Sequence, residues 1–420
     1  MKNIILLFSI ILMGRLNAQT WVTIPDANFA TYLQGLIPAA MNGNQMDTTS
    51  VLVATTTRTI SVVGKYIKDL TGITYFKSLK SLDCSYNNSL TTLPTLPNSI
   101  TYINCQHDSL TSITNLPTSL YNLYCPENFL TTLPTLPNSL SIVNCQLNLL
   151  VNLPAFDTSL QSLECNSNHL TNLPPLPNSL TYLDCSQNQL TTLPSLPNSL
   201  TYLDCLMNSL TSLPALDTSL NTLTCSKNSL TNLPALPNSL IELDCDENLL
   251  SNLPLLPNSL HILNCGGNNI SCFPAFPNSI YPANYVPQFS YWEYFINLDP
   301  NPYNCLPNYL PNSMTPTDLA KPLCGAGNSN GCAIAGINQL TDLNNQVNIY
   351  PNPTSGQFII ESNTAEKQIV QIIDVNGRIV LSETLTGITN IDATNFNEGV
   401  YTLVIKTANS IANKKLVVIH

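Results

Sequence analysis

The chain has 420 residues, of which only 9% are charged, and its formal net charge is −11 at pH 7. This length exceeds what one ordinary hydrophobic core needs, so the chain comprises several domains or an extended repeat array. The acidic balance excludes a nucleic-acid-binding role, because phosphate backbones would be repelled.

Residues 1–18 have the features of a secretory signal peptide. Lys2 supplies the positive end, residues 4–13 form an apolar stretch, and residues 16–18 (Leu-Asn-Ala) form a small-residue cleavage site. The apolar stretch is shorter than the ~20 residues of a membrane-spanning helix, which argues against a permanent anchor. We therefore expect an exported chain that begins at Gln19 and has no transmembrane anchor.

Residues 19–80 lack a clean repeat, and we expect them to form an N-terminal cap followed by an irregular first repeat. The stretch IPDANFATYLQGLIP predicts a short helix with Asp26 or Asn28 near its N-cap. Such a helix would cover the open end of a repeat core. The segment 59–76 resembles the first repeats of internalin-like bacterial surface proteins.

Residues 81–280 contain about ten units with a 20-residue period, such as LTYLDCSQNQLTTLPSLP at 180–197. Cysteine recurs without a slip from Cys105 to Cys265, whereas Cys84 is one residue out of step. The unit resembles the leucine-rich-repeat signature, with cysteine in place of its third leucine. Its LPxLPxSL part is similar to the repeats of bacterial LPX-type effectors, although nothing here resembles the ubiquitin-ligase domain that some of them have.

This repeat predicts a mostly β and irregular fold, a curved solenoid of short parallel strands. In each unit a pair such as Leu183 and Cys185 would point into a shared core, with neighbouring strands ~4.8 Å apart. Two prolines per unit exclude helix on the return side, so we expect an extended convex side. The asparagine at each bend, such as Asn188, is expected to bind backbone groups in a ladder, with Asp108 replacing it in the second unit.

Ten stacked cysteines could form disulfides, bind metal or remain free. Neighbouring strands hold Cβ atoms near ~4.8 Å apart, whereas a disulfide needs ~3.8 Å. A dry column also disfavours thiolates, and one row provides no tetrahedral cage. We therefore expect buried free thiols that act as small hydrophobic groups, and no metal or cofactor.

Residues 281–335 are expected to form a C-terminal cap. Two disulfides are predicted among four cysteines, and three pairings are open: Cys272, Cys305, Cys324 and Cys332. An aromatic cluster precedes most of them and favours a capping role over a ligand platform: Tyr291, Trp292, Tyr294 and Phe295.

The inner face of the arc is the candidate binding surface. The row just before each cysteine is acidic at five of ten positions, and Lys227 is the only lysine or arginine between residues 81 and 280. Aromatic side chains lie two residues further back, a mixture that suits polar or cationic ligands. The predicted ligand-binding residues are Tyr182, Asp184, Tyr202, Asp204, Glu242 and Asp244. A Ca²⁺ ion bridging carboxylates is an alternative, but no EF-hand spacing supports it.

After a linker at 336–346, apolar residues alternate with polar ones and predict a separate β-domain at 347–420. Its sequence blocks resemble the type A C-terminal sorting domain of the type IX secretion system. The resemblance implies a small β-sandwich that directs passage through the outer membrane by the type IX machinery. The residues that carry it are Tyr350, Pro351, Asn352, Pro353, Asp374, Gly377, Gly399 and Tyr401. An adhesive β-sandwich that stays attached is the alternative.

The combined features predict a cell-surface or secreted binding or adhesion protein whose partner is a protein or a glycan. A structural surface component is the alternative. A polymer hydrolase is disfavoured, because the carboxylates form a row on a shallow face and the four histidines share no motif. We therefore expect no enzymatic activity.

Overall fold

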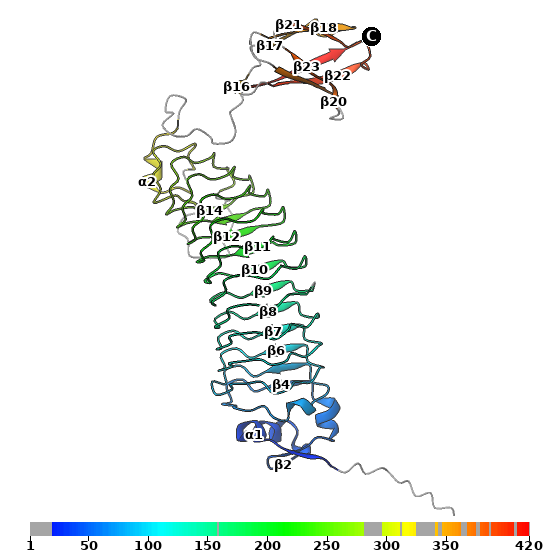
Figure 1. The fold of residues 1–420 in the computed structure, drawn as a ribbon, viewed down its shortest axis with the longest axis vertical. Coiled ribbons are helices and arrows are strands. Elements are labelled where there is room, and N and C mark those ends of the chain that lie inside the picture. Colours follow the sequence, from blue (N-terminus) through cyan, green and yellow to red (C-terminus); the bar gives the residue numbers. More distant parts are fainter. Residues whose placement is uncertain are drawn as a thin grey trace, which may run out of the picture. The chain divides into compact units, whose positions relative to one another are not determined.

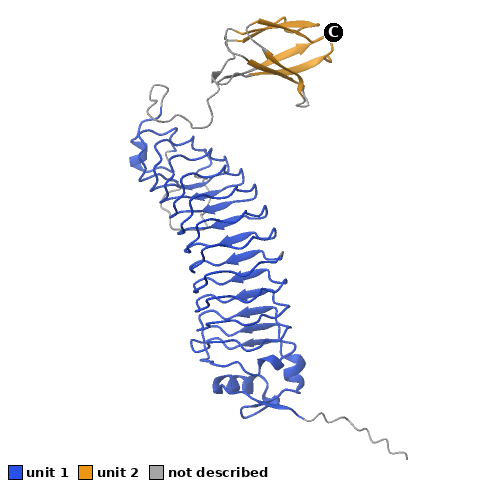
Figure 2. Ribbon diagram, in the orientation of Figure 1, with its two compact units in different colours: residues 1–328 blue, residues 329–420 orange. Residues whose placement is uncertain are grey.

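The computed structural model describes residues 19–157, 159–280, 296–310, 313–324, 341–342, 347–362, 368–374, 379–385, 388–406 and 410–419. The chain divides into two compact units, residues 1–328 and residues 329–420 (Figure 2). The predicted signal peptide, the aromatic cluster, Cys332, Gly377 and most of the predicted linker lie outside the described residues.

The N-terminal end of the first unit combines a short helix with a small antiparallel sheet. The helix is α1 (Ala27–Leu36), and the sheet has the order β1 (Trp21–Thr23), β3 (Gln45–Asp47), β2 (Met41–Asn42). As the sequence predicts, Asp26 caps the helix, since its Oδ1 accepts hydrogen bonds of 2.9 Å from two backbone N–H groups of the first turn. Phe29 and Leu33 are fully buried in the same core as the repeats, so this end covers the column.

A stack of short parallel strands follows and forms most of the first unit (Figure 1). Each strand pairs with its neighbours in register, so that Leu183 lies opposite Leu203. The twelve strands are β4 (Thr59–Ser61), β5 (Ser81–Asp83), β6 (Tyr102–Asn104), β7 (Asn122–Tyr124), β8 (Ile142–Asn144), β9 (Ser162–Glu164), β10 (Tyr182–Asp184), β11 (Tyr202–Asp204), β12 (Thr222–Thr224), β13 (Glu242–Asp244), β14 (Ile262–Asn264) and β15 (Ile296–Asn297). The predicted solenoid of about ten turns is confirmed.

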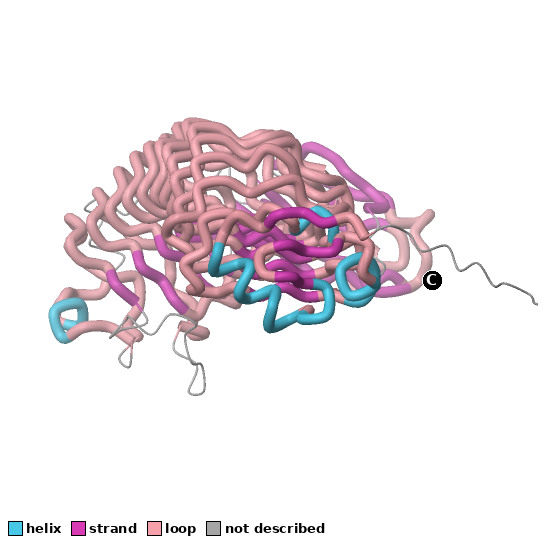
Figure 3. Tube along the Cα trace, turned by 90° about the horizontal axis from the view of Figure 1, so that it is seen from below, coloured by secondary structure: helices cyan, strands magenta, loops and turns pink. Residues whose placement is uncertain are grey.

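The return side of each coil is extended chain, as its prolines require. No helix occurs in the described residues between 81 and 280; the one-turn helices lie before them, at Pro38–Ala40, Leu52–Thr56 and Ile73–Tyr75. Seen along the stack, the return segments form wide loops away from the strands (Figure 3). Leu183, Cys185 and Leu190 are fully buried, so each coil contributes to one continuous core.

Asparagine side chains form the predicted ladder at the bends. Asn148 is typical: its Nδ2 donates to the carbonyl oxygens of Cys125, Cys145 and Gln146 at 3.0–3.2 Å. Its Oδ1 accepts from the N–H of Leu130 at 3.0 Å. One side chain therefore satisfies four backbone groups on two coils, where the chain leaves the strand and has no sheet partner.

The residue before each ladder asparagine, and before Asp108 in the second unit, adopts a left-handed backbone conformation, which the sequence does not signal. These residues have φ between 46° and 61° and are mostly not glycine, although that conformation is unfavourable for other residues. They are Tyr86, His107, Glu127, Leu147, Ser167, Gln187, Met207, Lys227, Glu247 and Gly267. The bend is thus imposed by the ladder and the core rather than by local propensity.

The ten ladder cysteines are free thiols and fully buried, as predicted. Several donate weak hydrogen bonds to the next strand; Cys105, Cys185 and Cys205 reach carbonyl oxygens at 3.4 Å. A leucine at this position could not make that contact. Burial raises the pKa of these thiols, that of Cys125 to about 12, so they stay protonated.

We expect these ten thiols to resist alkylation by iodoacetamide at pH 8 in the folded protein. The thiolate is the nucleophile, and burial both suppresses it and excludes the reagent. Mass spectrometry before and after unfolding in guanidinium chloride measures the labelling of each cysteine. Rapid labelling of Cys185 without denaturant would contradict a dry core.

The C-terminal end of the solenoid contains β15, helix α2 (Pro316–Leu319) and a disulfide between Cys305 and Cys324. Cys272 is disulfide-bonded too, so three of the four predicted cysteines are paired as disulfides. Tyr303 is buried beside Phe273, with ring centroids 5.2 Å apart. Its hydroxyl contacts the buried carboxylate of Asp318, which also closes a capping box with Thr315.

The second unit is the predicted β-sandwich, with two sheets that share one core and are antiparallel except for the short strand β16, which lies within the predicted linker and pairs with β23 in parallel. One sheet has the order β16-β23-β22-β19-β20 and the other the order β17-β18-β21. Val347, Phe358 and Leu403 are fully buried between them. The strands are β16 (Thr341–Asp342), β17 (Val347–Tyr350), β18 (Gln357–Ser362), β19 (Gln368–Ile373), β20 (Ile379–Leu385), β21 (Ile388–Asp392), β22 (Gly399–Lys406) and β23 (Ser410–Val418).

Candidate recognition surface on the strand face

The outward side chains of β5 to β14 form the surface that we call the strand face. Its two rows lie three residues and one residue before each ladder cysteine. Because the strands are in register, Tyr182 lies opposite Tyr202 and Asp184 opposite Asp204. The two tyrosine rings stack, with centroids 4.4 Å apart and planes within 4° of parallel. The repeat thus places a rigid aromatic pair directly beside two carboxylates.

The carboxylates beside the tyrosines are partly buried and crowded by like charges. Asp184 Oδ1 accepts from the N–H and the hydroxyl of Ser186, at 3.0 and 2.7 Å. Burial nevertheless raises the pKa of Asp184. Burial also raises the pKa of Asp204 to about 7, and the charge of Asp184 adds to the rise. A neighbouring cation would stabilise the ionised form of both carboxylates.

The other two predicted residues, Glu242 and Asp244, lie where the strand face is more buried or already hydrogen-bonded. Asp244 Oδ1 accepts from the Ser226 hydroxyl at 2.5 Å and from the Asn264 amide at 2.7 Å. Asn297 then donates to Asn264 at 3.0 Å, which continues the chain of amides to the last strand. Glu242 is only 9% exposed. The structure therefore brings Asp184, Asp204 and the tyrosines together. Two strands away, Asp244 belongs to a hydrogen-bond network and Glu242 is buried.

The lone cation of the array does not neutralise this face. Lys227 lies at a bend and contacts Glu247 at 3.6 Å, while His107 contacts Glu127 at 2.7 Å in the same row of bend residues. Among the described residues, no lysine or arginine lies within ion-pair distance of Asp184 or Asp204. No group of three or more histidine, cysteine or carboxylate side chains in the described part could hold a metal ion.

A second aromatic pair on the strand face was not among the predicted site residues. Tyr102 and Tyr124 lie on neighbouring strands with ring centroids 5.6 Å apart and planes tilted by 43°. Asn122, which lies opposite Tyr102 on the strand of Tyr124, has a buried Oδ1 that finds no hydrogen-bond partner in the described structure. The two tyrosines lie in different rows of neighbouring strands, so the residue pattern of a single row does not predict the pair.

The raised carboxylate pKa values predict a stability that depends on pH. Asp108, Asp204 and Asp244 each have a pKa near 7 in the folded chain, against an ordinary value of 3.8, mainly because they are buried. The folded state then binds more protons than the unfolded state between about pH 4 and pH 7, so stability falls as the pH rises through that window. We expect a higher unfolding temperature at pH 5 than at pH 8 by scanning fluorimetry. An unfolding temperature that rises over this range would contradict it.

In the second unit, two of the predicted sorting residues, Asn352 and Tyr401, lie next to the last strand, β23. Asn352 Nδ2 donates to the Lys415 carbonyl at 2.6 Å, and its Oδ1 accepts from the Val417 N–H at 2.8 Å. Tyr401 lies in β22, and its hydroxyl donates to the Asn397 carbonyl at 2.8 Å. Tyr350 is 42% exposed. The first and last blocks of the predicted motif therefore form one structural element.

Both the solenoid and the second unit are similar to known proteins. Residues 348–419 match the family described as the secretion system C-terminal sorting domain. The solenoid is similar to YopM from Yersinia enterocolitica WA-314, with 32% identity and a TM-score of 0.52 over 57% of this chain and 50% of that one. This chain thus spans about half the length of that YopM chain. No curated protein sequence matches the chain.

A further structural match is the functional domain of InlJ from Listeria monocytogenes, described as including a cysteine ladder. It has 17% identity and a TM-score of 0.38, over 96% of this chain and all of that one. A Shigella effector leucine-rich-repeat domain also matches, with 32% identity and a TM-score of 0.29, over 37% of this chain and 66% of that one.

The fold and the repeat define a leucine-rich-repeat solenoid. The second unit is a type IX secretion sorting domain, so the protein is exported to the cell surface or secreted, and it interacts with the type IX machinery. In the part of the chain that the structure describes, no helix has the length and hydrophobicity needed to cross a membrane.

Proposed function

We propose that this protein is a surface recognition or adhesion protein that binds cationic groups of a partner on its strand face. The observation that supports this most directly is the stacked Tyr182–Tyr202 pair beside Asp184 and Asp204, which have no cation near them in the described structure. Tyrosine supplies a large rigid contact area, and its ring face attracts cations. An acidic face also steers a basic partner during encounter.

A binding role is favoured over a catalytic one by the environment of the carboxylates. Asp244 accepts three hydrogen-bond contacts within the solenoid, and the other acids follow one another in register along the strands. A hydrolase needs two carboxyl groups that flank a bound substrate in a defined pocket. Rows on an open sheet instead resemble the extended surfaces that repeat proteins use for binding.

The proposal is tested by probing an array of extracellular glycans and proteins with the purified protein. A variant with alanine at Tyr182, Asp184, Tyr202 and Asp204 is expected to lose at least tenfold in affinity for whatever the parent protein binds. Asp217→Asn removes one charge from the return side and is the matched control, with no expected effect. Unfolding curves establish that both variants are folded.

The same experiment distinguishes the alternatives. If the alanine variant binds as the parent protein does, the strand face is not the recognition surface. If binding is unchanged and cells that produce the variant have a damaged envelope, the structural role is favoured. Parent affinity that increases between pH 6 and pH 8 would support a cationic ligand, because Asp204 ionises over that range.

A further inference from the structure

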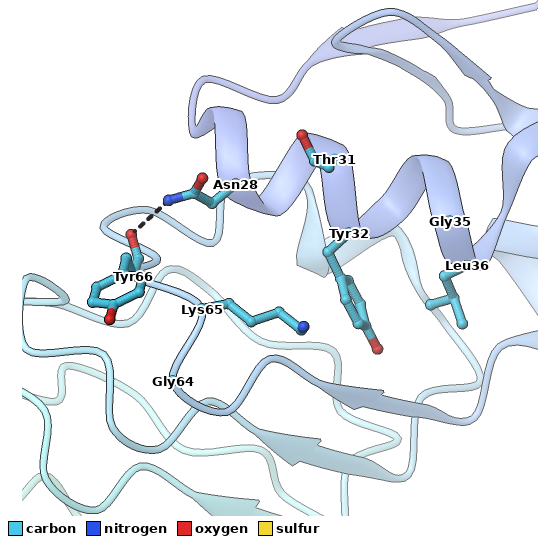
Figure 4. Close-up of a pocket in the computed structure, with 8 residues that line it drawn as sticks. All are labelled: Asn28, Thr31, Tyr32, Gly35, Leu36, Gly64, Lys65 and Tyr66. Atoms are coloured by element: carbon cyan, nitrogen blue, oxygen red, sulfur yellow. Dashed lines mark hydrogen bonds between the residues drawn. The ribbon is translucent and has the colours of Figure 1, made fainter.

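A groove lies at the N-terminal end of the first unit, between helix α1 and the loop that follows β4 (Figure 4). It is lined by both elements, including Tyr32, Gly35 and Leu36 of the helix and Gly64, Lys65 and Tyr66 of the loop. Its volume is about 700 Å³, within the ~300–1,000 Å³ typical of small-molecule sites. None of these residues belongs to the strand face.

Lys65 is an exposed cation that lines this groove. Its ammonium points along the groove toward the Tyr32 ring, 5.9 Å from the ring centre (Figure 4). No carboxylate among the described residues lies within ion-pair distance of it. The Tyr32 hydroxyl accepts from the Ser61 N–H at 3.1 Å, which fixes the ring as one wall of the groove.

Tyr66 also lines the groove, and its backbone is held in an unfavourable conformation. Its φ is 58°, which is rare for an aromatic residue, and its side chain is 78% exposed. The register with β5 places Gly64, with φ +61°, at the left-handed bend position of this coil. The repeat therefore does not require a second left-handed residue at Tyr66. Asn28 Nδ2 of the helix donates to the Tyr66 carbonyl at 3.1 Å and holds the loop in place. Strain of this kind concentrates at functional sites.

We propose that this groove binds a sugar that bears a carboxylate, such as a uronic acid. The Tyr32 ring offers a flat apolar surface to one face of a pyranose, and the Lys65 ammonium beside it matches a single carboxylate. Tyr66 adds a second aromatic side chain to the lining. The backbone at Gly35 and Gly64 leaves open space, since a Cβ at either position would contact nothing within 4 Å. This site is independent of the strand face and of its proposed cationic ligand.

Isothermal titration of the full chain with digalacturonic acid tests the proposal, with the neutral digalactose as the matched sugar. We expect binding of the acidic sugar only. Lys65→Met is expected to weaken it at least tenfold, whereas Lys68→Met, which removes an equal charge three residues away, changes it less than twofold. Tyr66→Gly keeps the left-handed backbone, removes the ring, and should also weaken binding.

Gly35→Leu separates loss of the site from loss of the fold. A Cβ at this position would meet nothing within 4 Å, Gly35 lines the groove, and leucine is a better helix former than glycine. We expect at least tenfold weaker binding and an unfolding temperature that does not fall. Absence of digalacturonate binding by the parent protein would overturn the proposal. Equal losses in the Lys65 and Lys68 variants, or equally tight binding of triglutamate, would overturn it as well.

Discussion

Replacing Asn148 by aspartate is expected to lower the free energy of unfolding by about 3–5 kcal/mol at pH 8. The Asn148 amide nitrogen donates to three carbonyl oxygens, and the side chain is 5% exposed. An aspartate would face the same three oxygens with an acceptor, so the hydrogen bonds would be lost and a charge would be buried among negative dipoles. Denaturant unfolding monitored by circular dichroism measures the change.

The second coil supplies the reverse substitution. Asp108 occupies a ladder position, and its Oδ1 accepts from the Asn87 N–H at 2.6 Å. Its Oδ2 lies 3.8 Å from the Cys84 sulfur, and burial raises its pKa to about 7. Asp108→Asn would retain the acceptor and add a donor toward the cysteine carbonyls. We expect it to stabilise the protein by about 1 kcal/mol at pH 8, and by less at pH 5, where the aspartic acid is protonated.

The two substitutions together provide a test of the ladder that does not depend on either alone. They exchange the same pair of residue types at equivalent positions, and the expected changes have opposite signs. If both destabilise the protein by similar amounts, the ladder position does not require an amide, and the explanation fails. In a repeat protein the loss at Asn148 can also separate the unfolding of the two ends, which would appear as a second transition.

Much of the solenoid could be predicted because it depends on contacts at a constant sequence separation. The 20-residue period places Tyr182 opposite Tyr202, so the aromatic stack follows from register alone. The Asn188 ladder position and the free, buried Cys185 follow from the same period. The helix capped by Asp26 could be predicted because capping is a local interaction.

The features that could not be predicted depend on contacts between unlike segments. Asp244 looks equivalent to Asp204 in the sequence, yet the hydroxyl of Ser226 and the amide of Asn264 bind only Asp244. The pairing of Cys305 with Cys324 was one of three open possibilities, because spacing does not determine connectivity. The N-terminal groove joins residues about 30 positions apart, and nothing in either segment alone signals it.

Deleting residues 347–420 is expected to abolish surface display in a bacterium with a type IX system, with at least tenfold less protein accessible to external protease. The deleted part contains the residues that match the sorting domain and every strand of the sandwich except the two-residue strand β16. The solenoid has its own core, separate from that of the second unit, so it should still fold and accumulate in the periplasm. Cell fractionation and immunoblotting measure both amounts.

Point substitutions in the second unit test whether export requires the folded sandwich or only a C-terminal segment of that length. Asn352→Ala removes both side-chain hydrogen bonds of Asn352 to the last strand and leaves the backbone hydrogen bonds of Thr354 in place. It should reduce surface display and lower the stability of this unit. Ile388→Ser changes a side chain that is 67% exposed and should leave export unchanged. Normal display of the deleted protein would show that export does not depend on this domain. If only the Asn352→Ala variant is displayed normally, export does not need these two hydrogen bonds. The type IX machinery would then recognise another part of the sandwich.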